Sequence, residues 1–106
     1  MIINIKTKII DLTKSLGSYV NSKLKFIPKL LIDLEKENAL QVDFEIAKLS
    51  QHHNKGNVFY AEANLWLAGK KIRAEYNSED IYKSIDLVKD TLKREIVKYK
   101  DKQSEV

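Results

Sequence analysis

The sequence predicts an α+β fold with the order β-α-β-β-β-α, in which two helices pack on one face of a four-stranded sheet. Stretches of alternating apolar and polar residues, typical of strands, occur at the start and in the middle of the chain. Two other stretches carry apolar residues at helical spacing. Each predicted element is apolar on one side only, so the simplest packing buries all these sides between one sheet face and one layer of helices.

The first predicted strand lies around Ile3 and Ile5, and the first helix follows it. Thr13 is a suitable N-cap, because its side chain can accept a hydrogen bond from a free backbone N–H. Apolar residues then recur at helical spacing at Leu16, Tyr19, Val20, Leu24 and Ile27. Pro28 should end or kink the helix, since it has no N–H. We therefore expect a helix over residues 14–27 and an irregular exit through Asn38.

Three strands are predicted next, around residues 40–46, 59–67 and 72–76. A polar loop, Ser50 to Asn57, and a tight turn at Gly69-Lys70 would join them as an antiparallel meander. Their outward positions would form an open sheet face of mixed charge: Gln41, Asp43, Glu45, Tyr60, Glu62, Asn64, Trp66, Lys71, Arg73 and Glu75.

The second helix is predicted to begin at Ser78 as the N-cap. Glu79 and Asp80 would lie in its first turn, where the helix dipole favours anions. Its apolar stripe is Ile81, Ile85, Val88, Leu92, Ile96 and Tyr99. Lysines near its C-terminal end suit the opposite pole of the dipole. We expect residues 1–102 to form a single domain and residues 103–106 a short C-terminal tail.

The composition fits a small cytoplasmic protein. The chain has 106 residues, no cysteine, 32% charged residues and a net charge of +4. Without cysteine, neither a disulfide framework nor a thiolate metal site can form. The N-terminus lacks the unbroken apolar core of a signal peptide, and no stretch approaches the ~20 apolar residues of a membrane span. The positive charge is compatible with a polyanionic partner.

The helices, rather than the sheet, are predicted to carry the outward basic side chains. At about 100° per residue, Lys83, Arg94 and Lys98 fall within an arc of roughly 60°, and Lys25 and Lys29 also face away from the core. Such lysines either solvate a helix face or contact phosphates in register. Lys23 lies near the apolar stripe instead. Its stem either lies along the sheet edge, or its charge stands in a groove between the helices.

Other chemical signals are weak or absent. His52-His53 lacks the spacing of a metal site, and no phosphate-binding glycine loop occurs. No set of residues has the pattern of a catalytic site, so we expect no enzyme, no cofactor and no small-molecule substrate. Tyr60 and Trp66 on the open sheet face could stack on bases, but exposed strand aromatics more often pair across strands.

The second helix carries a more specific pattern. It reads Asp80-Ile81-Tyr82-Lys83-Ser84-Ile85-Asp86, followed by Leu92, Arg94, Ile96 and the run Lys98-Tyr99-Lys100-Asp101-Lys102. A weaker match lies at Asn4-Ile5 and Ile10-Asp11-Leu12-Thr13. Together with the element order, these residues resemble the ribosome hibernation promoting factors, also described as ribosome-associated inhibitor or sigma modulation proteins. The resemblance covers residues 1 to about 102.

The resemblance implies a fold similar to double-stranded RNA-binding domains, and a protein that is monomeric when free. It also implies binding to the small ribosomal subunit and its rRNA near the decoding centre, where messenger and transfer RNA would be blocked. The matching basic positions are Lys23, Arg94, Lys98, Lys100 and Lys102. The length matches the short form, which lacks the C-terminal domain that long forms use to pair ribosomes.

The chain departs from the family pattern at Gly17, Phe26 and Thr91, where a basic residue is usual. Lys25, Lys89 and Lys93 can supply charge from neighbouring positions. The full set of predicted RNA-binding residues is Lys23, Lys25, Lys83, Lys89, Lys93, Arg94, Lys98, Lys100 and Lys102. Two alternatives remain open: a general binder of structured RNA, and a protein-interaction module that uses the open sheet face around Trp66.

Overall fold

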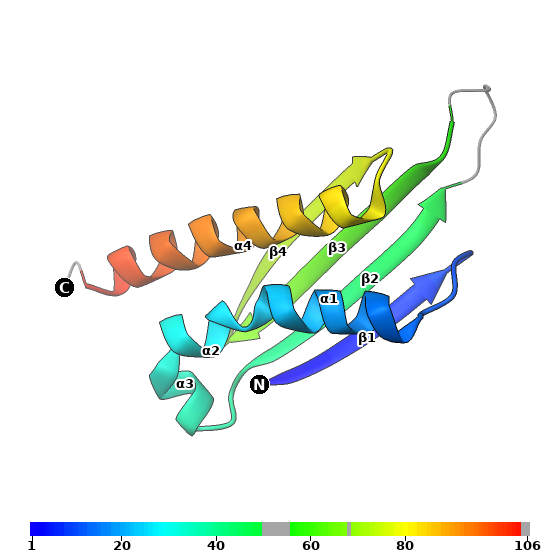
Figure 1. The fold of residues 1–106 in the computed structure, drawn as a ribbon. Coiled ribbons are helices and arrows are strands. Elements are labelled where there is room, and N and C mark those ends of the chain that lie inside the picture. The colour runs from blue at the N-terminus through cyan, green and yellow to red at the C-terminus, as the bar shows by residue number, and fades with distance from the viewer. Residues whose placement is uncertain (50–55, 68, 105–106) are drawn as a thin grey trace.

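The computed structural model describes residues 1–49, 56–67 and 69–104. Its four-stranded sheet has the order β1-β2-β3-β4, and Figure 1 shows α1 and α4 side by side on one face of it. The elements are β1 (Ile2–Lys8), α1 (Lys14–Leu24), α2 (Phe26–Leu30), α3 (Ile32–Lys36), β2 (Gln41–Leu49), β3 (Val58–Leu67), β4 (Lys70–Ser78) and α4 (Ile81–Gln103). The predicted α+β class and the placement of both helices on one face are confirmed.

The sheet is mixed. β1 pairs with β2 in parallel, because the chain crosses over through α1, α2 and α3 before β2 begins. β2, β3 and β4 are antiparallel, which confirms the predicted meander. Of the two predicted connections, residues 50–55 of the polar loop and residue 68 beside the turn lie outside the described residues. His52-His53 falls in the first of these gaps. Gly69 has a φ of +76°, a conformation that glycine adopts without strain.

The first helical region differs from the prediction. Thr13 caps α1 as expected, its Oγ1 accepting a hydrogen bond from the Leu16 N–H at 3.1 Å. However, α1 ends at Leu24 rather than at residue 27, and the segment expected to be irregular forms α2 and α3. Pro28 lies in the first turn of α2, where its missing N–H breaks no helical hydrogen bond. Asn38, at a φ of +55°, ends this region in the left-handed conformation that asparagine tolerates.

The start of α4 is also corrected. Asp80, and not Ser78, is the N-cap, with its Oδ1 accepting a hydrogen bond from the Tyr82 N–H at 2.8 Å. Ser78 ends β4, and its Oγ lies 2.6 Å from the Oγ of the buried Ser84. At the other end, α4 continues through Gln103, one residue into the predicted tail.

One hydrophobic core lies between the sheet and the helices. The largest fully buried side chains are Phe44, Leu24, Ile27, Leu40, Ile46, Leu65, Ile85, Leu92, Ile96, Val20, Val42 and Val88. All of α4's predicted stripe except its two ends is therefore buried, and the opposite side of the helix is left to solvent. Figure 1 shows that the last turns of α4 project past the end of the sheet.

Candidate nucleic-acid interface

α4 holds most of the predicted RNA-binding residues, and the core fixes which way they point. Burial of Ile85, Val88, Leu92 and Ile96 sets the rotation of the helix, so that residues about half a turn away face outward. The exposed basic residues of α4 are Lys83, Lys93, Arg94, Lys98, Lys100 and Lys102, whereas Lys89 is half-buried. The predicted outward direction of these side chains is confirmed.

Several of the predicted RNA-binding residues form no ion pair in the part of the chain that the structure describes. Within residues 1–49, 56–67 and 69–104, no ion pair involves Lys25, Lys83, Lys93, Arg94, Lys100 or Lys102. Within the described part of the chain, the guanidinium of Arg94 makes one side-chain hydrogen bond, from its Nη2 to Thr91 Oγ1 at 3.3 Å. Lys98 pairs with Glu95 at 3.4 Å, but its side chain is 64% exposed. A surface pair of this kind contributes little to stability and exchanges easily for a phosphate.

Lys23 of α1 reaches across to Asp86 of α4, so its charge lies between the two helices and not along the sheet edge. Its Nζ lies 3.2 Å from Asp86 Oδ1 and 5.1 Å from the centroid of the Tyr19 ring. Tyr19 Oη donates a hydrogen bond to the same carboxylate oxygen at 2.6 Å. Asp86 therefore raises the pKa of Lys23 and, through this hydrogen bond, also that of Tyr19. Lys23 is charged but already paired.

The departures from the family pattern have a structural counterpart at Phe26. Lys89 Nζ lies 6.0 Å from the centroid of the Phe26 ring and 3.6 Å from Asp90 Oδ1. A positive charge therefore stands over the aromatic ring, supplied from α4 instead of from α2. Gly17 lies on the partly exposed side of α1, and a Cβ there would meet only Leu12 Cδ1 at 3.8 Å. The backbone at Gly17 would thus accept a larger side chain.

A second basic surface lies between β4 and the C-terminal half of α4. A groove there, which we call the β4–α4 groove, is lined by Lys70, Lys71, Ile72, Arg73, Glu95, Lys98, Tyr99, Asp101 and Lys102. Lys70 Nζ lies 5.3 Å from the centroid of the Tyr99 ring, which links the two elements. The sequence reasoning did not include Lys70, Lys71 and Arg73, because it assigned them to a turn and to the mixed sheet face. The run Gly-Lys-Lys-Ile-Arg at the start of β4 was the available signal.

On the open sheet face, the Asp43 carboxylate is already hydrogen-bonded to neighbouring side chains of the same face. This carboxylate accepts hydrogen bonds from Asn4 Nδ2 at 3.1 Å, Gln41 Nε2 at 3.2 Å and Trp66 Nε1 at 2.9 Å. These donors, the Asn4 amide first, hold the pKa of Asp43 below its usual range. The indole of Trp66 remains 45% exposed, with Lys71 Nζ 5.2 Å from its ring.

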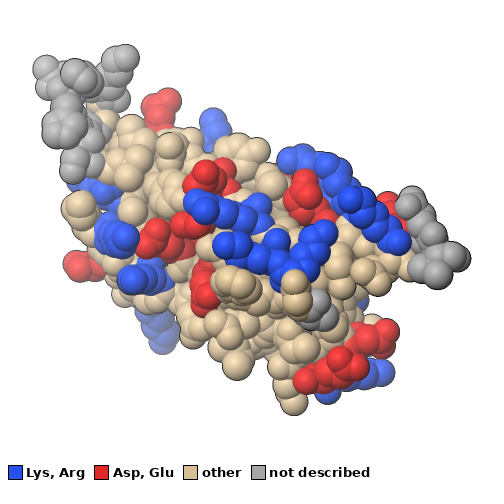
Figure 2. All heavy atoms as spheres, turned by 180° about the vertical axis from the view of Figure 1, so that it is seen from behind, with Lys and Arg blue, Asp and Glu red and all other residues tan. Residues whose placement is uncertain are grey.

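A row of glutamates crosses the same face. Glu45, Glu62 and Glu75 are direct neighbours on β2, β3 and β4, an arrangement that is unfavourable for like charges. Arg73 bridges Glu62 at 3.1 Å and Glu75 at 2.9 Å, and Tyr60 Oη donates to both. Burial and these carboxylates raise the pKa of Tyr60. Figure 2 shows acidic and basic side chains side by side over this face. The hydroxyl group of Tyr60 is therefore already hydrogen-bonded to Glu62 and Glu75.

Two further observations concern metal binding and membrane-spanning helices. Among the described residues, no group of three His, Cys, Asp or Glu side chains is arranged to hold a metal ion. In the same part of the chain, no helix is long and apolar enough to cross a membrane.

The chain is similar to known proteins along nearly its whole length. Residues 3–104 match the family described as Sigma 54 modulation protein / S30EA ribosomal protein. A ribosome hibernation promoting factor of Azotobacter vinelandii is 33% identical over 99% of this chain and 88% of its own length. A ribosome hibernation promotion factor of Picosynechococcus is 35% identical over 88% of this chain but only 46% of its own length.

Solved structures share the fold. A ribosomal subunit interface protein from Coxiella burnetii superposes with a TM-score of 0.73 at 24% identity, covering 95% of this chain and 99% of the other. The N-terminal domain of Thermus thermophilus Protein Y gives a TM-score of 0.67 at 21% identity, covering 93% and 99%. With the family match over almost all residues, the resemblance seen in the second helix is confirmed: the chain belongs to the Sigma 54 modulation protein / S30EA ribosomal protein family.

Proposed function

We propose that this protein is a ribosome hibernation factor of the cytoplasm that binds the small ribosomal subunit and stops translation. The observation that carries the proposal is the family match over residues 3–104, together with relatives named ribosome hibernation promoting factors that align along most of their length. Within the subunit, the proposed place is near the decoding centre. There the bound domain would exclude messenger and transfer RNA by occupying their space, without any catalytic step or cofactor.

The charge distribution supports an RNA partner for α4. Buried hydrophobic residues hold the helix firmly, while Lys83, Lys93, Arg94, Lys100 and Lys102 form no ion pair among the residues described. Lys98 is paired only with Glu95 on the exposed surface of the same helix, within the described residues. Arg94 can donate two parallel hydrogen bonds to one phosphate, and the lysines act as point charges. The proposed contacts are Lys25, Lys83, Lys93, Arg94, Lys98, Lys100 and Lys102, with Lys23 and Lys89 reaching RNA only by exchanging Asp86 and Asp90 for phosphate.

The proposal is tested by co-sedimentation of the purified protein with isolated small subunits across a salt series, beside a cell-free translation assay. Each phosphate contact releases counterions, so binding should be saturable and should weaken steeply as salt rises. Inhibition of translation should follow occupancy of the subunit. If the protein fails to sediment with small subunits even at low salt, the ribosomal function is wrong.

Two other functions give different results in the same assay. A general binder of structured RNA would be displaced from small subunits by an excess of a free RNA duplex, whereas a ribosome-specific factor would stay bound. A protein-interaction module on the sheet face would bind with little dependence on salt, because few counterions are released when apolar surfaces meet.

A further inference from the structure

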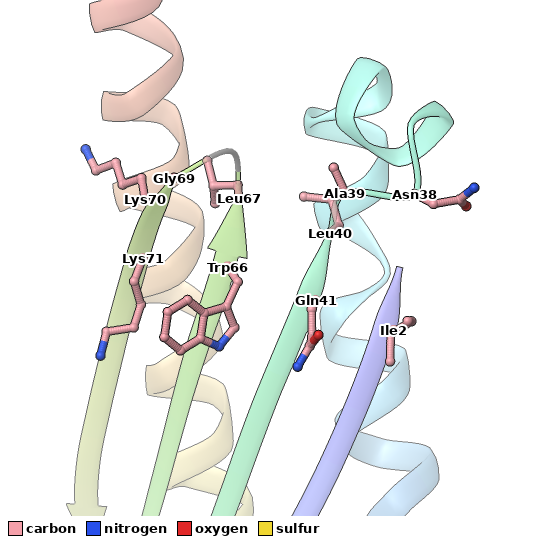
Figure 3. A pocket seen from close by; sticks show the side chains of 10 residues that line it. All are labelled: Ile2, Asn38, Ala39, Leu40, Gln41, Trp66, Leu67, Gly69, Lys70 and Lys71. Carbon is pink, nitrogen blue, oxygen red and sulfur yellow. The ribbon is translucent and has the colours of Figure 1, made fainter.

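A shallow hollow lies at one end of the open sheet face, beside the turn that joins β3 to β4 (Figure 3). Its volume is about 520 Å³, within the range of sites that hold small ligands. Ile2, Leu67 and Trp66 supply its apolar lining, and the Ile2 side chain is largely exposed. Figure 3 shows the indole of Trp66 nearly face-on, with Lys71 on one side and Gln41 on the other. A flat aromatic surface is therefore open to solvent.

The charge around this hollow is positive. Lys70 and Lys71 line it, and none of its described lining residues is a carboxylate. Asp43 lies beside it, but this carboxylate is occupied by three N–H donors, including the Trp66 indole. The glutamate row crosses the sheet further along, where Arg73 and Tyr60 engage it. The chemistry that fits the hollow is thus a flat ring next to a negative charge.

We propose that the hollow binds an unpaired RNA nucleotide, with the base stacked on Trp66 and the phosphate held by Lys71. Lys70, which points toward Tyr99 of α4, adds positive charge from the other side of β4. Stacking on an aromatic side chain together with lysine contacts is how proteins hold single-stranded nucleic acid. The inference rests on the proposed function, because the RNA would be that of the small subunit. It extends the contact surface from the helices to the sheet face, on the side of the molecule that α1 and α4 leave uncovered (Figure 1).

The two surfaces are continuous. Lys70 and Lys71 line both the hollow and the β4–α4 groove, whose other basic residues include Lys98 and Lys102. An RNA strand that follows the C-terminal half of α4 can therefore reach Trp66 across the start of β4. The five basic residues along this path outnumber its two carboxylates, Glu95 and Asp101. A peptide partner would gain nothing from this excess of cations unless it were strongly acidic.

The residues of the hollow are already positioned for such a ligand. The hydrogen bond of 2.9 Å from Trp66 Nε1 to Asp43 Oδ2 fixes the plane of the indole. Lys71, the cross-strand neighbour of Trp66, places its Nζ 5.2 Å from the Trp66 ring on the same face of the sheet. Ordering before binding reduces the conformational entropy that is lost on binding.

Trp66 is the only tryptophan of the chain, so its fluorescence reports directly on the hollow. Single-stranded hexaadenylate should quench this fluorescence saturably, because a stacked base deactivates the excited indole. Inorganic polyphosphate, which carries charge without bases, should compete with hexaadenylate but should not quench. Replacing Lys70 and Lys71 with Gln should shift the quenching curve several-fold to higher concentration. The matched control, Lys6→Gln with Lys14→Gln, should leave the curve unchanged.

Binding to small subunits supplies a second test. Trp66→Leu should weaken binding about fivefold or more, the contribution expected of one stacked base, whereas Trp66→Phe should retain most of the affinity. Phe keeps an aromatic face but loses the hydrogen bond to Asp43, so the pair separates stacking from positioning. Melting curves of both variants check that each is folded.

Two results would overturn the nucleotide site. One is an absence of quenching by hexaadenylate at low salt together with normal subunit binding by Trp66→Leu. The other is equal quenching by a polyglutamate peptide, which would indicate a site for acidic protein segments. Both differ from failure of the proposed function, in which the unaltered protein itself would not sediment with small subunits.

Discussion

The outward side of α4 and the open face of the sheet have similar numbers of charges but arrange them differently. On the sheet, Asp43 is bound by three donors and the glutamate row is bridged by Arg73. On α4, Lys83, Lys93, Arg94, Lys100 and Lys102 form no ion pair within the described residues. A charge already satisfied inside the protein loses a partner when it binds elsewhere, whereas an unpaired surface charge does not. The comparison favours α4 as the main phosphate-binding surface.

The largest expected effect comes from reversing the charge of two basic residues on the outward side of α4. Arg94→Glu with Lys98→Glu should weaken binding to small subunits about a hundredfold or more, because two charge-assisted contacts become repulsions. Both side chains are exposed, so the melting temperature should hardly change. Co-sedimentation at fixed salt measures the loss. Lys6→Glu with Lys14→Glu makes the same change of net charge far from α4, and equal weakening by this control would show that only net charge matters.

A smaller effect should follow from releasing a paired cation. Asp86→Asn removes the charge that holds Lys23 while keeping an oxygen that can accept from Tyr19 Oη. If Lys23 contacts rRNA, the affinity for small subunits should increase by up to about fivefold and should depend more steeply on salt. The change is read from the salt series. Unchanged affinity and slope would place Lys23 among the structural residues instead.

The stability that Asp43 contributes to the sheet face should depend on pH. The pKa of Asp43 is lowered in the folded protein, chiefly by the Asn4 amide, so the folded state binds fewer protons than the unfolded state. The stabilisation is therefore fully present above the unfolded pKa of about 3.8 and is lost as pH falls below it. Asp43→Asn should cost about 1 kcal/mol at neutral pH, with less difference from the unaltered protein near pH 2. Thermal melts from pH 2 to 7 test this, and a difference independent of pH would contradict it.

The smallest effect is expected at the glutamate row. Glu62→Gln removes the central one of three neighbouring like charges. It keeps one of the two oxygens that accept from Tyr60 and Asn64. Because the loss of repulsion is offset by a weaker contact with Arg73, stability should change by no more than about 0.5 kcal/mol. Urea unfolding measures it. A loss of several times this size would mean that the carboxylate anchors the face more strongly than its contacts indicate.

Local signals in the sequence were enough for the order of the elements and for the direction of α4. Both follow from the spacing of apolar residues, which a tertiary structure seldom overrides in long, strongly periodic segments. Prediction failed where two local solutions were nearly equal. Ser78 and Asp80 are both suitable N-cap residues. In the structure Asp80 is the N-cap, and its backbone has the extended conformation of a cap residue, with a ψ of 122°. Pro28 can end one helix or lie in the first turn of another, and the structure shows it in the first turn of α2.

The candidate site was likewise predictable only in part. The cations of α4 could be identified because one periodic helix presents them all, but the partners of Lys23 and Lys89 could not, because Asp86 and Phe26 reach them across the helix packing. The sequence also did not predict that Lys70 and Lys71 of β4 line a groove with α4.

By itself, the sequence determined the alternation of strands and helices, the buried stripe of α4 and the family, since these depend on residue type and spacing along the chain. Only the tertiary structure decided which charges are already neutralised and which cations meet across β4 and α4. The reason is physical: an ion pair depends on distances between side chains from different elements, and such distances exist only once the core has fixed those elements together.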